Sequence, residues 1–217
     1  MTDSPDDGLI DLYGLLAYAE LVAFFRLSED GALAPTLADK AALAGMAVAE
    51  FSHFEKIQTE LVRLGADPDR AMQPFAAPLD GFHARTMPSD WLEGLVKAYV
   101  GDGFAADFYR AAADLLQPGP RALVLEVLAD TGHAQFAVRH VRAAIEADPK
   151  VAGRLALWAR RLVGEALSQA QRVTAEHPSL ARLLVGEGES QLGEMGRMFA
   201  QITDAHAKRM NALGLSS

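Results

Sequence analysis

The amino-acid sequence predicts an all-α protein. Alanine and leucine dominate a composition that is 50% hydrophobic, and apolar residues recur at spacings of three and four along most of the chain. The β-branched runs and alternating patterns that strands need are scarce. A chain of 217 residues is long enough for one well-filled domain, and no break in composition indicates a second. We therefore predict one domain over residues 1–217, with a core bundle at about 8–147 and two extra helices at about 151–213.

The first predicted helix covers about residues 8–27. Its apolar stripe includes one acidic residue, Glu20, near the middle. Residues 28–31, Ser-Glu-Asp-Gly, are turn formers and predict the end of this helix. A carboxylate on a buried stripe needs a partner, because an unpaired buried charge is costly.

The second predicted helix opens near Thr36 and ends at Gly65, since glycine favours a helix C-terminus. Glu50 and His53 fall in the middle of its stripe. Residues 66–87 contain three prolines and several other turn formers. This composition predicts a long connection with little regular structure, which is typical of bundles with a crossover between their second and third helices.

The third predicted helix starts after Pro88, with Ser89 as its N-cap, and carries Asp102 on its stripe. Asp102 is flanked by Gly101 and Gly103. Glycine inside a helix costs about 1 kcal/mol relative to alanine. Two glycines here favour a site where another group approaches the backbone closely.

The fourth predicted helix lies between Pro120 and Asp148 and carries Asp130 and His133 on its stripe. Two more helices are predicted at residues 151–176 and 192–213, and we expect them to pack outside the four-helix core. The last of them would either cover the bundle or form the interface of a homodimer.

Six polar side chains therefore occupy core-facing positions on four predicted helices. They are Glu20, Glu50, His53, Asp102, Asp130 and His133. Two of these helices carry an acid-x-x-His motif, whose spacing of three places both side chains over the same turn. Such buried groups require either metal or a hydrogen-bonded polar layer, and the surrounding apolar stripe offers that layer few partners. The arrangement is typical of a carboxylate-bridged two-metal site in a four-helix bundle.

The acid-x-x-His motif alone is weak evidence. For this composition, chance predicts about 0.8 matches, and the chain has three. The third match, Asp80 to His83, lies in the proline-rich connection and is taken as the chance one. The two helical matches differ from it because a stripe carboxylate precedes each, at 30 residues from Glu20 to Glu50 and 28 from Asp102 to Asp130. The two halves therefore form an approximate repeat of a helical hairpin.

On these residues the chain resembles the ferritin-like superfamily of non-haem di-iron carboxylate proteins. Within it, the layout is most similar to the tRNA-modifying hydroxylases that act on 2-methylthio-N6-isopentenyladenosine. The resemblance implies a ferritin-like four-helix bundle that binds two iron ions. By that resemblance each residue would have a role: Glu20 and His53 would be terminal ligands of one iron, Asp102 and His133 of the other, and Glu50 and Asp130 would bridge the two.

The chain departs from the family pattern at two of these positions. Asp102 and Asp130 stand where the pattern usually has glutamate, and each shortens the reach by one methylene. The shorter reach would open a coordination position, change the metal or weaken one site. The ligand set without sulfur suits iron or manganese.

Three functions from different classes follow. The first is an oxygen-activating hydroxylase or monooxygenase that uses an external electron donor and, by the resemblance, a modified tRNA nucleoside. The second is a ferritin-like protein that oxidises ferrous iron or reduces peroxide, and the third is a metal-free helical binding module. The arginines of residues 151–176 suit a tRNA-binding surface, although an ordinary solvated face suits them as well: Arg154, Arg160, Arg161 and Arg172.

Composition and charge exclude several kinds of site and classes of protein. The chain has no cysteine, which excludes a disulfide framework and a thiolate metal site. The net charge of −9 disfavours indiscriminate nucleic-acid binding but leaves room for a local basic patch. The acidic N-terminus does not resemble a secretory signal, and no segment has the uninterrupted apolar length of a membrane span. We therefore expect a cytoplasmic protein without a membrane partner.

Overall fold

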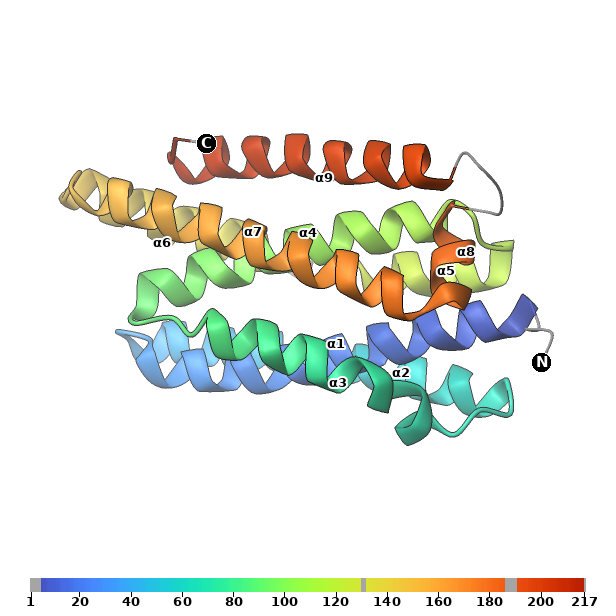
Figure 1. The fold of residues 1–217 in the computed structure, drawn as a ribbon. Helices are drawn as coiled ribbons and strands as arrows, with labels where there is room; N and C mark the ends of the chain where they lie inside the picture. The colour runs from blue at the N-terminus through green and yellow to red at the C-terminus, as the bar shows by residue number, and fades with distance from the viewer. Residues whose placement is uncertain (1–4, 130–131, 186–190, 217) are drawn as a thin grey trace.

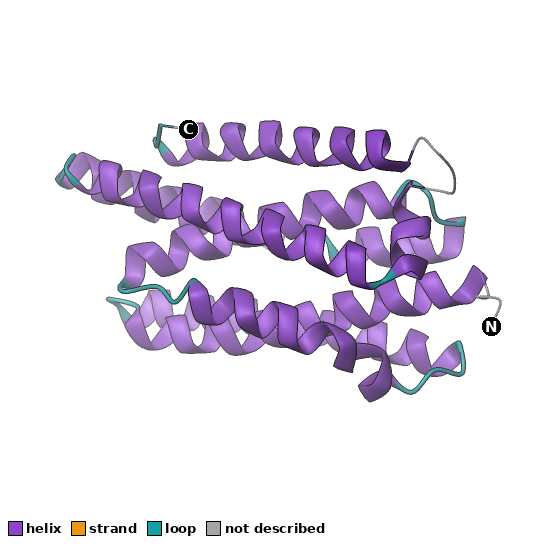
Figure 2. Cartoon of the chain, viewed as in Figure 1, coloured by secondary structure: helices purple, strands orange, loops and turns teal. Residues whose placement is uncertain are grey.

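The computed structural model describes residues 5–129, 132–185 and 191–216, and within these ranges it contains nine α-helices and no strand (Figures 1 and 2). The helices are α1 (Pro5–Leu33), α2 (Leu37–Arg63), α3 (Pro68–Arg85), α4 (Trp91–Ala113), α5 (Pro118–Val127), α6 (His133–Ala147), α7 (Val151–Glu176), α8 (Pro178–Val185) and α9 (Gln191–Leu213). The predicted all-α class is confirmed.

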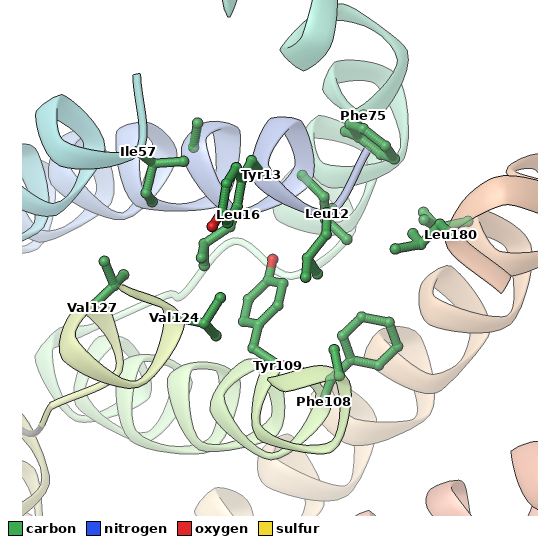
Figure 3. Packing of buried hydrophobic residues seen from close by; sticks show 14 of the residues in the cluster. Leu12, Tyr13, Leu16, Ile57, Phe75, Phe108, Tyr109, Val124, Val127 and Leu180 are labelled. Carbon is green, nitrogen blue, oxygen red and sulfur yellow. The ribbon is translucent and has the colours of Figure 1, made fainter. Parts of the chain in front are cut away.

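The helices are arranged in three layers (Figure 1). One layer holds α1, α2 and α3, the middle layer holds α4 to α8, and α9 lies outside it against α4 and α6. Buried side chains from several helices fill the space between the layers, as Figure 3 shows for Leu16, Phe75 and Tyr109. The four-helix bundle is therefore formed by α1, α2, α4 and the pair α5–α6, with α3 in the crossover.

In the first hairpin, the predicted start of α2 is confirmed and the predicted end of α1 is wrong. Thr36 is the N-cap of α2, and its side chain accepts a hydrogen bond from the backbone N–H of Asp39 at 3.1 Å. The turn predicted at residues 28–31 is not formed, because α1 continues to Leu33. The Ser28 hydroxyl donates back to the carbonyl of Phe24 at 2.8 Å, so this turn former is accommodated within the helix.

The irregular connection predicted for residues 66–87 is also wrong, because most of it is α3. Asp67 caps this helix, and Pro68 occupies its first turn, where proline is well tolerated. Pro74 and Pro78 lie inside the helix and each removes one backbone donor. The burial of Phe75 and Met72 against α1 outweighs this loss.

The fourth predicted helix is broken into α5 and α6, and the prediction of one continuous helix is wrong. Gly132 directly precedes α6 with φ of 95°, which is left-handed backbone that favours glycine. Asp130, one of the predicted ligands, lies outside the described residues. The N-cap of α4 also differs, since Asp90 rather than Ser89 accepts the hydrogen bond from Glu93 N–H, at 2.9 Å.

The C-terminal helices add to the core. The bounds of α7 agree with the predicted 151–176, and Leu155 and Leu162 pack in one buried cluster with Val100 of α4. The final helix begins one residue earlier than predicted, at Gln191. A helix that was not predicted from the sequence, α8, packs on α1.

The first helix is the most apolar. By length and mean hydropathy, residues Asp7–Leu33 could cross a membrane, contrary to the expectation that no segment would be apolar enough. Half of the most apolar window is buried, and the helix packs against α2, α3 and α8. This burial identifies α1 as a core helix and is compatible with a soluble protein.

Candidate metal centre

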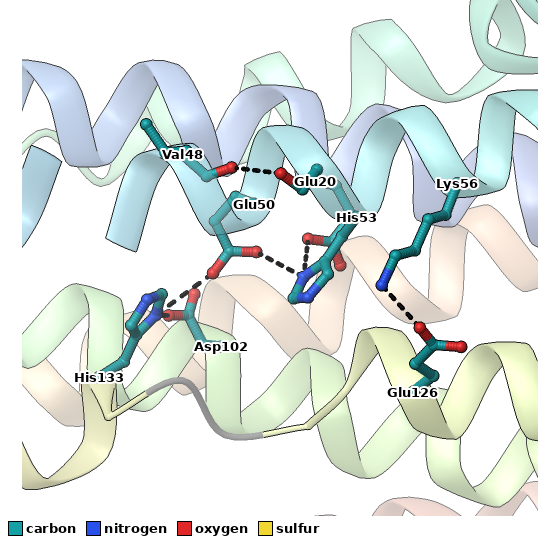
Figure 4. A network of polar contacts seen from close by, with 9 residues as sticks. Glu20, Val48, Glu50, His53, Lys56, Asp102, Glu126 and His133 are labelled. Carbon is teal, nitrogen blue, oxygen red and sulfur yellow. Dashed lines mark hydrogen bonds and ion pairs between the residues drawn. The ribbon is translucent and has the colours of Figure 1, made fainter. Parts of the chain in front are cut away.

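Five of the six predicted ligands lie on described residues, and the bundle gathers them at one place (Figure 4). Glu20 comes from α1, Glu50 and His53 from α2, Asp102 from α4, and His133 is the first residue of α6. Each of the first four stands at the middle of a long helix, where the backbone is held on both sides. The structure therefore brings together side chains that are up to 113 residues apart in the sequence.

Glu50 occupies the centre of this cluster. One of its oxygens, Oε2, lies 3.6 Å from Nδ1 of His53, and the other, Oε1, lies 3.3 Å from Nδ1 of His133. Oε2 of Glu20 lies 3.5 Å from His53 Nδ1, and Oδ2 of Asp102 lies 3.7 Å from His133 Nδ1. The carboxylate of Glu50 thus faces two imidazoles, each of which has a second carboxylate beside it (Figure 4).

These separations suit a shared cation better than hydrogen bonds. Good N–H···O hydrogen bonds are about 2.7–3.2 Å long. Two atoms bound to one ion lie about 3.0–3.6 Å apart if each is about 2.1 Å from it at an angle near 90–120°, so the observed 3.3–3.7 Å would need only a small contraction around an ion. Oε2 of Glu20 and Nδ1 of His53 are buried, and among the described residues neither has a hydrogen-bond partner. Glu20, Glu50 and His53 form a group whose donor atoms all lie within 4.8 Å of one another. The donor set therefore fits a metal ion.

Burial and mutual contact shift the proton affinities of the cluster. Burial raises the pKa of Glu20 well above its usual value. Burial alone would also raise the pKa of Glu50, but contacts with His53 and Glu20 bring it below its usual value. The carboxylate of Glu20 first, and that of Glu50 second, raise the pKa of His53 to about 9. The metal-free cluster therefore holds a proton on His53 at neutral pH, and a cation must displace it.

The raised pKa of His53 predicts a pH dependence of stability in the metal-free protein. Its ordinary pKa is 6.5, so the stabilisation is fully present below pH 6.5 and is lost as the pH rises through about 9. We expect the free energy of unfolding to fall by about 1–3 kcal/mol over this interval. Urea unfolding at several pH values, in the presence of a chelator, measures this change.

His53→Gln supplies the comparison, because glutamine cannot titrate. The difference in stability between the parent protein and His53→Gln should shrink between pH 6.5 and pH 9. A difference that stays constant across this range would contradict the prediction.

Two cavities meet at the cluster. One, of about 300 Å³, contains Glu20, Glu50, His53 and His133 in its wall. The other, of about 380 Å³, lies between α1, α3, α4 and α7. Asp102 lines both, so half of its side chain is exposed, yet protein surrounds the carboxylate and burial raises its pKa.

A cation that no sequence pattern indicated, Arg209 of α9, lies beside the cluster. Its Nη1 donates to Oδ2 of Asp107 at 2.7 Å, and its side chain lines the smaller cavity. A Cβ on Gly103 would lie 2.5 Å from Cδ of Arg209, so this glycine permits the close approach that its position indicated. Nothing lies within 4 Å of the corresponding point on Gly101, which instead lines the larger cavity.

We expect Arg209→Met to lower the free energy of unfolding by about 2 kcal/mol, because it leaves the carboxylate of Asp107 without its closest partner. The double variant with Asp107→Asn should recover at least half of this loss, since both charges are then absent. Urea unfolding measures both. Lys208→Met, at the exposed neighbouring position, is the matched control and should change stability by less than about 0.5 kcal/mol.

The arginines of α7 are engaged within the chain. Arg154 pairs with Asp90 and Glu93, Arg160 donates to the carbonyl of Ser216, Arg161 donates to the carbonyl of Arg85, and Arg172 pairs with Glu176. Their charges are therefore partly neutralised or directed at backbone carbonyls.

Comparison with known proteins agrees with the fold. Residues 3–187 match the ferritin-like domain of actinomycetes, a range that contains α1 to α8 and all six predicted ligands. No curated protein matches the chain. The matched range is most of the 217 residues. The chain therefore belongs to the actinomycete ferritin-like domain family.

Proposed function

We propose that the protein is a non-haem di-iron oxidoreductase that activates dioxygen to hydroxylate an organic substrate. The observation that carries this proposal is the position of Glu50, whose two carboxylate oxygens face the imidazoles of His53 and His133. A carboxylate so placed can bridge two cations, which is how helical bundles of this kind hold a pair of metals. Membership in the ferritin-like family is compatible with such a pair.

The residues divide into two half-sites. Glu20 and His53 would hold one ion, Asp102 and His133 the other, and Glu50 would join them. Two bound iron ions would supply the electrons and the open coordination positions that dioxygen chemistry needs. The half-site of Asp102 has the shorter carboxylate and stands beside the helix break at Gly132, so its ion should be the more weakly held.

The apolar cavity beside the cluster favours an organic substrate over ferrous iron or peroxide. It shares Asp102 and Tyr109 with the metal cavity. A mostly apolar space of about 380 Å³ suits an organic molecule, whereas neither ferrous iron nor peroxide requires one. Oxygen insertion would also need an external electron donor. A tRNA nucleoside gains no support from the charge of α7, because its arginines have partners within the chain.

Metal analysis tests the proposal directly. Protein expressed in iron-replete medium should contain about two iron ions per chain by mass spectrometry of the metals. When the reduced protein is mixed with dioxygen, an oxygen electrode should record about one dioxygen consumed for each pair of irons. Less than about 0.2 iron or manganese per chain would exclude this function and leave a metal-free binding module.

A further inference from the structure

The larger cavity, called the channel below, is large enough for a small-molecule ligand. Its walls come from α1, α3, α4 and α7, and its volume of about 380 Å³ falls within the range of small-molecule sites. Most of the lining is apolar, and its inner part is formed by Leu15, Phe104, Phe108, Ala170 and Val173. Such a space excludes water and suits a hydrocarbon.

The channel lies next to the metal-cluster cavity, and residues of α1 and α4 separate the two. Ala19 and Ala23 of α1 and Ala105 of α4 line both cavities, together with Asp102 and Tyr109. The three alanines leave room that larger side chains would fill. A molecule in the channel would therefore lie alongside the carboxylate of Asp102.

Two cations, Lys97 and Arg26, line the outer end of the channel together with two carboxylates, Glu29 and Asp30, and some N–H donors of the cations have no hydrogen-bond partner among the described residues. Lys97 lines it, is 7% exposed, and donates one hydrogen bond, from Nζ to the carbonyl of Thr86 at 2.7 Å. An ammonium group has three donors, and among the described residues no carboxylate forms an ion pair with Lys97. Nε of Arg26 is also buried without a partner, although Nη1 of Arg26 is bound to Glu29 at 2.6 Å. These N–H groups are unmet donors for an anion.

The other groups at this end change its charge but leave these N–H donors without a hydrogen-bond partner among the described residues. Burial raises the pKa of Asp30 to about 6, so this carboxyl is still mostly ionised at neutral pH and partly offsets the charge of Lys97. His83 is neutral, because burial and the nearby cations lower its pKa to about 3, and its Nδ1 has no partner among the described residues. Leu33 and Met87, both exposed, also line the channel and offer apolar contacts to a hydrocarbon chain.

We propose that this channel binds an elongated aliphatic carboxylate as the substrate of the metal centre. Its carboxylate accepts hydrogen bonds from Lys97 and Arg26, and its chain runs inward past Asp102 toward Phe108. Along α4, Asp102 is about 7.5 Å from Lys97 and Phe108 about 16.5 Å, at 1.5 Å per residue. Ions held at the cluster would thus lie beside the middle of the chain. The binding site itself is independent of the proposed function. Only the ligand's role as a substrate rests on that function.

Titration of the metal-free, full-length protein with dodecanoate tests the site without any catalytic readout. Calorimetry should give one site per chain with a Kd below about 100 µM. Lys97→Met should weaken dodecanoate binding at least about tenfold and leave the binding of 1-dodecanol unchanged, because only the charged partner is lost. Lys40→Met, at an exposed position, is the control and should bind dodecanoate as the parent does.

Gly101→Leu tests the channel itself. No atom lies within 4 Å of the added Cβ, so the helix tolerates it, while the side chain enters the channel. It should weaken both dodecanoate and dodecanol at least about tenfold, whereas Gly101→Ala should change either by less than about threefold. A circular-dichroism melt of each variant verifies that it is folded.

Three results would overturn the proposal: no binding of dodecanoate, binding that Gly101→Leu leaves intact, or a Lys97→Met variant that binds dodecanoate as tightly as the parent. The metal analysis is separate. A protein that contains two irons but does not bind dodecanoate refutes the channel alone. A protein that binds dodecanoate but contains less than about 0.2 iron or manganese per chain after expression in iron-replete medium refutes the di-iron function alone.

Discussion

Glu50→Ala is expected to lower the metal content from about two ions per chain to below about 0.2, because it removes the carboxylate that faces both imidazoles. Loss of a terminal ligand should be milder. Asp102→Ala should release mainly the ion nearer His133 and leave about one ion per chain, because Glu20, Glu50 and His53 remain together. Mass spectrometry of the metals, after gel filtration, measures both.

The matched control for Glu50→Ala is Glu55→Ala, an exposed carboxylate on the same helix. It should retain about two ions per chain. If Glu50→Ala keeps one tightly bound ion, Glu50 belongs to a single half-site and the bridge is wrong. If Glu55→Ala loses metal as well, the loss reflects the folding of α2 rather than the ligand.

Helix boundaries were predictable where local chemistry determines them. Thr36 caps α2 through its own side chain, and Gly65, with φ of 76°, follows its end. Asp67 and Pro68 indicate the start of α3 in the same way. The prolines within residues 66–87 nevertheless led to the prediction of an irregular connection. What stabilises α3 is the burial of Phe75, a tertiary effect that no local pattern contains.

In the cluster, too, local sequence determines some positions and tertiary packing determines others. Glu20, Glu50 and His53 were predictable because each lies on the apolar stripe of a long helix, and spacing places them on one face. His133 was found by the same motif, although the continuous helix expected around it is broken at Gly132. Its proximity to Glu50 is therefore a result of tertiary packing rather than of helical spacing.

Residues beyond the stripes were not predictable in the same way. Lys97 lies at a helical position that a solvated lysine could equally occupy, and only the tertiary fold buries it: α3 and α4 both pack on α7, and Phe82 of α3 lies under the ammonium group. Arg209 approaches the cluster from α9, more than 100 residues after Asp102. The glycine at 103 indicated that some group approaches the backbone there, but not which one.

Among the Gly→Ala substitutions, each of which adds one methyl group, we expect Gly14→Ala to lower the free energy of unfolding most. A Cβ on Gly14 would lie 2.1 Å from the carbonyl oxygen of Ala71, so α1 and α3 must separate to admit it. The obstacle is backbone on both sides, and we expect a loss of at least about 3 kcal/mol in the free energy of unfolding. The control is Gly45→Ala on α2, which meets no atom within 4 Å and should stabilise the protein by about 0.5–1 kcal/mol.

Because α3 supplies one wall of the channel, Gly14→Ala should also disturb the ligand site from a distance. Phe82 and His83 of α3 line the channel, and both would move with the helix. A Gly14→Ala protein that remains folded at low temperature should therefore bind dodecanoate more weakly while its metal content, held by α1, α2, α4 and α6, stays at the parent value. Urea unfolding, calorimetry and metal analysis of one preparation separate these effects. Equal stability of Gly14→Ala and Gly45→Ala would mean that α3 does not pack on α1 as described.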